Sequence, residues 1–318
     1  MKNDHLAAAA LLVAASLSPL SACDFCAIYS ATKARGETGP GLYAGIAEQF
    51  THFGTLQNEG VEAANPTGQY LDSSISQVFA GYRFNNRGSV QFNAPIIYRA
   101  FRRPEGFAID QGTESGLGDF SVIGSYLIYR RLTENTTLLW DVFGGVKFPT
   151  GSTDRLKEEF NEVAVPGAPV SGIHGHDLTL GSGSYDGLLG TSVYARRDRI
   201  FFGASVQYAI RSEGDFDYTF ANDLIWSGGP GVLLLLNEAF TLSLQANISG
   251  ETKGRDTFQG QKAEDTGVTA VYAGPVILFT WGDRLSAEAG VDLPASIQNT
   301  SLQAVPDYRL RAAVSWRF

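Results

Sequence analysis

Beyond its first 22 residues, the sequence has no apolar run of about 18 residues, the length that a helix needs to cross a bilayer. The longest apolar piece, 232–236, has only the length of a strand. Charged residues are sparse at 18%, and the mean hydropathy of −0.06 is typical of neither a helical membrane protein nor a disordered chain. The net charge is −9 and no run of Lys and Arg occurs, so the sequence does not support nucleic-acid binding.

Only two cysteines occur, Cys23 and Cys26, and they follow a segment with the features of an export signal. Lys2 precedes an apolar run, 6–17, that is too short to span a bilayer. We therefore expect residues 1–22 to be a signal peptide and residues 23–40 to be an N-terminal periplasmic segment. The two thiols allow three interpretations: acylation of Cys23, a disulfide between Cys23 and Cys26 in an oxidising envelope, or a metal or redox role.

The last eleven residues, 308–318, alternate between two kinds of side chain. Tyr308, Leu310, Val314, Trp316 and Phe318 fall on an apolar face, whereas Arg309, Arg311 and Arg317 fall on the other face. This period of two predicts a strand with one apolar and one polar side. The strand ends on an aromatic residue, which looks like the recognition signal of outer-membrane proteins, so we expect the barrel-assembly machinery to bind through Phe318. The alternative from this stretch alone is an edge strand of a soluble sheet.

Similar alternation recurs along the chain and predicts the fold. Long connections follow the odd segments and short turns follow the even ones, which is the rhythm of an outer-membrane barrel. We expect an all-β, closed, up-and-down antiparallel transmembrane β-barrel of about 12 strands over residues 41–318, in the bacterial outer membrane and in contact with its lipid. The twelve alternating segments are 41–53, 74–84, 89–101, 118–130, 136–148, 183–195, 200–211, 219–235, 240–250, 266–280, 285–293 and 308–318.

Charged residues on the polar faces are the candidates for the lumen. By parity they are Arg99, Asp119, Asp141, Lys147, Arg211, Glu288, Asp292, Arg309, Arg311 and Arg317. About twelve strands enclose less space than the 16 strands of a porin. Two hypotheses follow: the lumen conducts small solutes, or side chains and residues 23–40 fill it and the barrel acts as a structural scaffold or surface-binding protein.

Three short motifs carry a resemblance to a known family. They are Ser115-Gly116-Leu117-Gly118-Asp119, Lys147-Phe148-Pro149-Thr150-Gly151 and Leu180-Gly181-Ser182-Gly183. With these motifs the chain resembles the transporter-like outer-membrane barrels of the meta-pathway of phenol degradation, over about residues 42–318. The resemblance implies a channel or transporter for small solutes of hydrophobic or aromatic character. We expect mainly structural roles for the motif residues, with Asp119 pointing into the lumen or capping a loop.

Catalytic and metal-binding residues have little support in the sequence. His174, His176 and Asp177 are weak candidates for a metal site, because two imidazoles and a carboxylate are suitable ligands. A solvated outer loop is the favoured explanation for them, so we expect no metal and no cofactor. A barrel hydrolase is the less favoured alternative, since His52 is the only histidine in a predicted strand. We therefore expect a protein that is not an enzyme.

Overall fold

The computed structural model describes residues 40–161, 165–237 and 239–318. The expected signal peptide, the segment 23–40 and the thiols of Cys23 and Cys26 lie outside the described residues. No described helix is long and apolar enough to cross a membrane.

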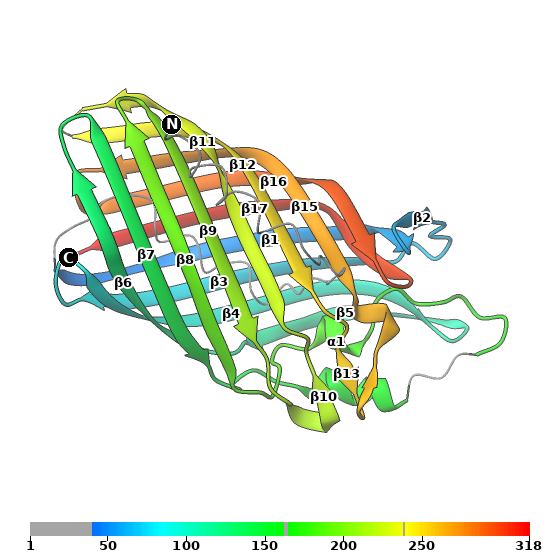
Figure 1. Ribbon diagram of the computed structural model, residues 1–318. Helices are drawn as coiled ribbons and strands as arrows, with labels where there is room; N and C mark the ends of the chain where they lie inside the picture. The colour runs from blue at the N-terminus through cyan, green and yellow to red at the C-terminus, as the bar shows by residue number, and fades with distance from the viewer. Residues whose placement is uncertain (1–39, 162–164, 238) are drawn as a thin grey trace, which may run out of the picture.

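Twelve antiparallel strands close into a barrel, which confirms the predicted fold (Figure 1). Each strand pairs with its neighbour along the chain, and β17 closes the barrel on β1 with Tyr43 opposite Arg317. The strands are β1 (Gly41–Asn58), β3 (Tyr70–Arg83), β4 (Gly88–Glu105), β6 (Ser121–Leu132), β7 (Thr136–Lys147), β8 (Asp186–Arg197), β9 (Ile200–Ile210), β11 (Asp223–Leu236), β12 (Phe240–Lys253), β15 (Val268–Trp281), β16 (Leu285–Asn299) and β17 (Gln303–Arg317).

The alternation of each strand separates an outer apolar face from an inner polar face. On β17, Leu310 and Val314 are exposed on the outside, whereas Arg309 is 4% exposed inside the barrel. Closure leaves no free strand edge in the wall, so the backbone groups of the strands are paired with one another. The outer surface is therefore suited to hydrocarbon and the inner surface to water or polar side chains.

Two of the expected loops are largely strand. The segment 102–117 continues β4 to Glu105 and returns as β5 (Ala108–Leu117), which pairs with β4. The segment 294–306 is shortened to a turn, because β16 runs to Asn299 and β17 begins at Gln303. Hydrophobic alternation reports a difference in environment between two faces, so it fades where a hairpin extends beyond the apolar band, although backbone pairing continues.

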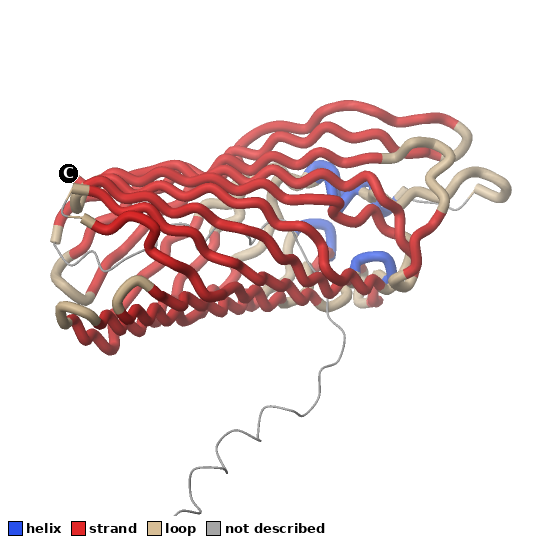
Figure 2. Tube along the Cα trace, turned by 90° about the horizontal axis from the view of Figure 1, so that it is seen from above, coloured by secondary structure: helices blue, strands red, loops and turns tan. Residues whose placement is uncertain are grey.

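The longest connection is 148–185, and its described parts, 148–161 and 165–185, fold into one mouth of the barrel, which we call the long-loop end. It contains a 3-10 helix, η2 (Asp154–Phe160), and one α-helical turn, α1 (Gly175–Leu178). Figure 2 shows the helical segments, in blue, gathered at that end of the barrel. Ile173 and Leu178 are fully buried there against Leu71 and Phe101 of the wall. This apolar contact holds the loop inside the mouth.

Smaller elements complete the long-loop end. They are β2 (Val61–Ala63), η3 (Asp215–Asp217), β10 (Tyr218–Thr219), β13 (Thr257–Phe258), β14 (Gln261–Lys262) and η4 (Glu264–Thr266). The strands β10, β13 and β14 form a separate small sheet. At the opposite end, which we call the short-turn end, the strands are joined by turns such as 282–284 between β15 and β16.

Several inward aromatic rings lie directly on glycines of the next strand. Phe143 faces Gly190, and Trp226 faces Gly250, as cross-strand partners. A Cβ atom at Gly190 would lie 2.2 Å from the Phe143 ring, and one at Gly250 would lie 2.4 Å from the Trp226 indole. The absent side chains let the rings pack against the wall, which leaves the centre of the lumen less filled.

Candidate solute site in the barrel lumen

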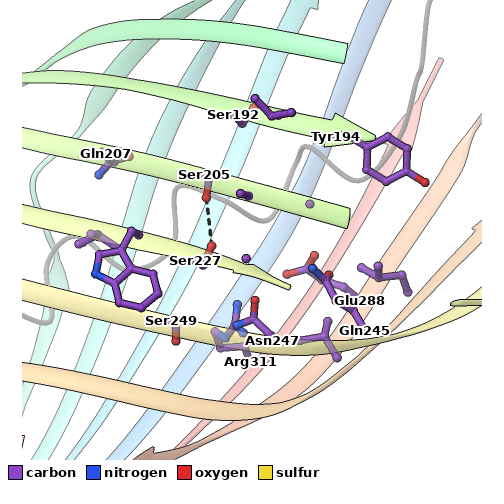
Figure 3. Close-up of a pocket in the computed structure, with 18 of the residues that line it drawn as sticks. Ser192, Tyr194, Ser205, Gln207, Ser227, Gln245, Asn247, Ser249, Glu288 and Arg311 are labelled. Atoms are coloured by element: carbon purple, nitrogen blue, oxygen red, sulfur yellow. Dashed lines mark hydrogen bonds between the residues drawn. The ribbon is translucent and has the colours of Figure 1, made fainter. Parts of the chain in front are cut away.

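A cavity of about 200 Å³ lies inside the barrel (Figure 3). Its lining comes from β1, β4, β6–β9, β11, β12 and β15–β17, so it belongs to the lumen rather than to one part of the wall. Most of its polar groups are uncharged hydroxyls and amides. Four carboxylates and two guanidinium groups also line it.

A row of serines crosses one side of this cavity. Ser192, Ser205, Ser227 and Ser249 are successive cross-strand partners on β8, β9, β11 and β12. Ser205 and Ser227 share a hydrogen bond of 3.0 Å between their hydroxyl oxygens, drawn in Figure 3. Residues in such a row lie at one height in the wall, so the four hydroxyls form a continuous neutral band.

Buried amides beside the serine row have hydrogen-bonding atoms that no described residue satisfies. Asn247 is 6% exposed and its Nδ2 has no partner among the described residues. The same holds for Nε2 of Gln207 and for both polar side-chain atoms of Gln49. Buried polar groups are nearly always hydrogen-bonded in folded proteins. These groups therefore mark positions where water or a solute can bind.

The charged part of the lining lies mainly on β16 and β17, with Glu251 contributed by β12 and Asp141 by β7. Arg311 Nε is 2.7 Å from Asp292 Oδ2, and Arg309 is 3.1 Å from Glu251. The Arg309 guanidinium also lies 4.5 Å from the centre of the Tyr272 ring. Glu288, in contrast, makes no ion pair or hydrogen bond with any described residue. Each of the two arginines thus has a carboxylate partner within the lining.

A second ionic group, held by four ion pairs, lies where β6–β11 end at the long-loop end. Lys147 is 2.6 Å from Asp119 and 2.7 Å from Asp186. Arg211 is 2.7 Å from Asp186 and 2.8 Å from Asp223. All five side chains are at most 3% exposed. Removing either cation would leave buried carboxylates beside each other, so this chain of ion pairs connects the strand ends.

The three motifs of the sequence meet at Asp119. Its Oδ1 accepts hydrogen bonds from the backbone N–H groups of Thr150 (3.1 Å) and Gly151 (3.0 Å), and its Oδ2 accepts one from the N–H of Ser182 (2.9 Å). Asp119 thus binds both the start and the end of the inserted loop. The motifs are far apart in the sequence, yet together they form the base of the loop.

The histidines of the inserted loop are buried, contrary to the expectation of a solvated loop. His176 is 5% exposed and lies 3.0 Å from Glu159, and His174 lies 3.3 Å from Asp265. Burial alone would lower the pKa of His176, but the carboxylates of Asp177 and Glu159 outweigh it and raise that pKa to about 10. Burial would raise the pKa of Glu159, yet His176 lowers it to about 2. The two side chains therefore form a charged pair inside the mouth.

The polar side chains around α1 bind one another and the backbone of the loop. Among the described residues, no group of three or more His, Cys, Asp and Glu side chains is placed to hold a metal ion. The Asp177 carboxylate accepts a hydrogen bond of 2.9 Å from the backbone N–H of His174, and so it caps α1. Arg99, which is 1% exposed, donates to the backbone oxygens of Asp177 and Thr179. Arg99 thereby connects the β4 strand of the wall to α1.

The structure distributes the ten charged lumen candidates over four places. Five of them line the cavity, namely Asp141, Glu288, Asp292, Arg309 and Arg311. Arg99 binds α1, and Arg317 pairs with Asp283 at the short-turn end. The remaining three, Asp119, Lys147 and Arg211, belong to the ionic group of the strand ends. The serine row and the amides were not among the candidates. Alternation places residues such as Gln207 and Asn247 inside, but only the strand register aligns them.

No family model matches the sequence, and no curated protein matches it in sequence. Among solved structures, an outer-membrane channel from Pseudomonas putida F1 is similar with a TM-score of 0.63 at 13% identity, over 88% of this chain and 96% of that chain. The translocator domain of the autotransporter NalP from Neisseria meningitidis has a TM-score of 0.40 at 14% identity, over 88% and 89% of the two chains. The similarity to the Pseudomonas protein supports the twelve-stranded barrel fold.

Proposed function

We propose that this protein is an outer-membrane channel for small solutes. The observation that carries the proposal is the cavity inside the barrel, which is lined by polar groups from nearly every strand and contains buried amides without a described partner. A barrel that served only as a scaffold has no need of unsatisfied polar groups in its centre. The barrel similar to it in Pseudomonas putida F1 is described as an outer-membrane channel, which agrees with this function.

The apolar outer face supports a location in the outer membrane. We propose that the long-loop end faces the exterior and the short-turn end faces the periplasm, as in other barrels of this kind. The expected export by residues 1–22 and assembly through Phe318 belong to the same proposal. Phe318 is 71% exposed, and its backbone N–H donates to the carbonyl oxygen of Leu42 (3.0 Å). Its ring is therefore accessible at the seam between β17 and β1.

The second candidate function is that of a plugged barrel that binds a partner at the surface. The inserted loop favours it, because α1 is buried in the mouth and held by Arg99 and by the pair of His176 and Glu159. The lumen of outer-membrane barrels is a water-filled channel in some proteins and is plugged by loops or a helix in others, so both functions occur with this fold. Conductance decides between the two functions.

The test is ionic current through the full-length protein in planar bilayers. A channel gives discrete current steps, and replacing Ser227 in the serine row by Phe should lower the step size, because the ring would fill part of the cavity. Val206→Phe, at an exposed outward position of β9, adds the same kind of bulk outside the lumen and should leave the current unchanged. Absence of steps in the unaltered protein would contradict the channel function and favour the plugged barrel.

The solute class implied by the family resemblance can be tested in the same preparation. Liposome swelling compares aromatic solutes such as phenol with sugars and organic acids of similar size. The cavity contains aromatic rings, among them Trp226 and Phe143, but hydroxyls and amides form much of its lining. Faster swelling with phenol than with a sugar would support an aromatic substrate, and the reverse order would favour a hydrophilic one.

A further inference from the structure

The lumen cavity is lined by buried side-chain amides on opposite sides of the barrel. Gln207 lies on β9 and Gln49 on β1, and these strands are six positions apart in either direction around the twelve-stranded wall. Both side chains line the cavity, and they are 7% and 1% exposed. Asn247 lines it from a third strand, β12, and is likewise buried. A solute in this cavity therefore has amides around it rather than on one side.

Two of these amides extend the serine row at its two sides. Gln207 is the next inward residue after Ser205, toward the long-loop end of β9. Asn247 is the next inward residue to Ser249, toward the short-turn end of β12. Figure 3 shows both amides beside the row. The hydroxyls and amides thus form one uncharged polar strip on this side of the lumen.

The hydrogen-bonding atoms that no described residue satisfies include donors and an acceptor. Nε2 of Gln207, Nε2 of Gln49 and Nδ2 of Asn247 are donors, whereas Oε1 of Gln49 is an acceptor. The Ser249 hydroxyl, also without a described partner, can donate or accept. A carboxylate on a solute only accepts and an ammonium group only donates, so neither satisfies the whole set. A hydroxyl group does both and fits each of these positions.

The number and spread of these atoms indicate how many hydroxyls the solute carries. The amides come from three strands, two of them on opposite sides of the lumen, so one hydroxyl cannot reach them all. The two arginines of the lining already have carboxylate partners, because Arg311 is bound to Asp292 and Arg309 to Glu251. The lining therefore offers several uncharged hydrogen-bonding positions to a single solute.

We infer that the lumen cavity binds a small, uncharged, polyhydroxylated solute such as a monosaccharide, with Gln49 and Gln207 contacting its hydroxyls from opposite sides and Asn247 and the serine row contacting them from the wall. This inference rests on the proposed function, since a solute reaches the cavity only if the lumen is open to it. It names the solute class for that channel. It differs from the aromatic class that the family resemblance implies, because phenol has a single hydroxyl.

The experiment compares ring compounds that differ in charge and in the number of hydroxyls. Glucose, cyclohexanol, phenol and glucuronate are titrated calorimetrically at neutral pH into the full-length protein, in a detergent without a sugar headgroup. We expect glucose to bind at least about ten-fold more tightly than cyclohexanol or phenol, because each of these has one hydroxyl. Glucuronate should bind no more tightly than glucose. Binding of cyclohexanol or phenol as tight as that of glucose, or tighter binding of glucuronate, would overturn the inference.

Two lumen variants and one control locate the site. Gln207→Met and Gln49→Met keep the approximate size of each side chain and remove its amide. Each should weaken glucose binding by about three- to ten-fold, the range expected for the loss of one hydrogen bond. Gln261→Met makes the same change at an exposed residue of β14 and should have no effect. Unchanged glucose binding in both lumen variants, with circular dichroism spectra of a folded barrel, would overturn the inference.

Current measurements on the same preparation keep the two proposals distinguishable. A protein that conducts ions but does not prefer glucose to cyclohexanol and phenol would retain the channel function and refute the site for a polyhydroxylated solute. A protein that binds glucose with this preference but gives no current would support the site and refute the channel.

Discussion

Replacing His176 by Ala should release the inserted loop from the mouth of the barrel. His176 Nδ1 lies 3.0 Å from Glu159 Oε1, and the backbone N–H of His176 donates to the same oxygen at 2.8 Å. At an effective dielectric constant of about 20, two unit charges at this separation attract by about 5 kcal/mol. Breaking a buried pair by removing one partner typically costs about 3–5 kcal/mol. The equilibrium for docking the loop should therefore shift by roughly a hundred-fold to a few thousand-fold.

Amide hydrogen exchange measures this shift directly. In His176→Ala, the amides of η2 and α1 should exchange faster, whereas amides of the wall strands, such as those of β12, should keep their protection. Adding Glu159→Gln should recover part of the loss, because the buried group left without a partner is then neutral rather than charged. If both variants exchange like the unaltered protein, the pair does not hold the loop. If the wall strands also lose protection, the effect is not confined to the loop.

Three further predictions concern pH, the ionic group and the lumen wall. The pair of His176 and Glu159 contributes its full stability between about pH 4.5 and 6.5. Below this range the stability is lost as Glu159 is protonated toward its pKa of about 2, and above it as His176 is deprotonated toward its pKa of about 10. Loop amides that lose their exchange protection within the range would contradict this prediction. Lys147→Met should destabilise the barrel by about 3–5 kcal/mol, because Asp119 and Asp186 are left buried without this cation. The control Lys157→Met removes a cation from an exposed ion pair and should cost about 0–1 kcal/mol. Thermal unfolding followed by circular dichroism measures both changes, and equal shifts would contradict a special role for the ionic group. Gly190→Ala should push the Phe143 ring toward the lumen and lower the single-channel current. The control Gly187→Ala should leave the current unchanged, because its Cβ would lie 3.8 Å from its nearest neighbour. Equal currents in the two variants would refute the packing of the Phe143 ring on Gly190 as the reason for the open lumen.

Sequence alone was sufficient to predict the class of fold. Alternation such as that of residues 240–250 depends only on whether a side chain faces outward or inward, and this property repeats with a period of two wherever a strand separates two environments. The short turns were predicted for the same reason, since they interrupt the alternation abruptly. The hairpin formed by β4 and β5 was missed because its outer part has no such contrast between faces.

The arrangement within the lumen was decided only by the tertiary structure. Alternation places Ser192, Ser205, Ser227 and Ser249 inside the barrel, but it does not say that they lie side by side, because that depends on the register between four strands. The burial of His176 likewise depends on a long loop folding back into the mouth, for which local sequence has no periodic signal. The sequence thus determined that there is a lumen and which residues face it, whereas strand register and loop insertion determined which of those residues are paired and which remain available to a solute.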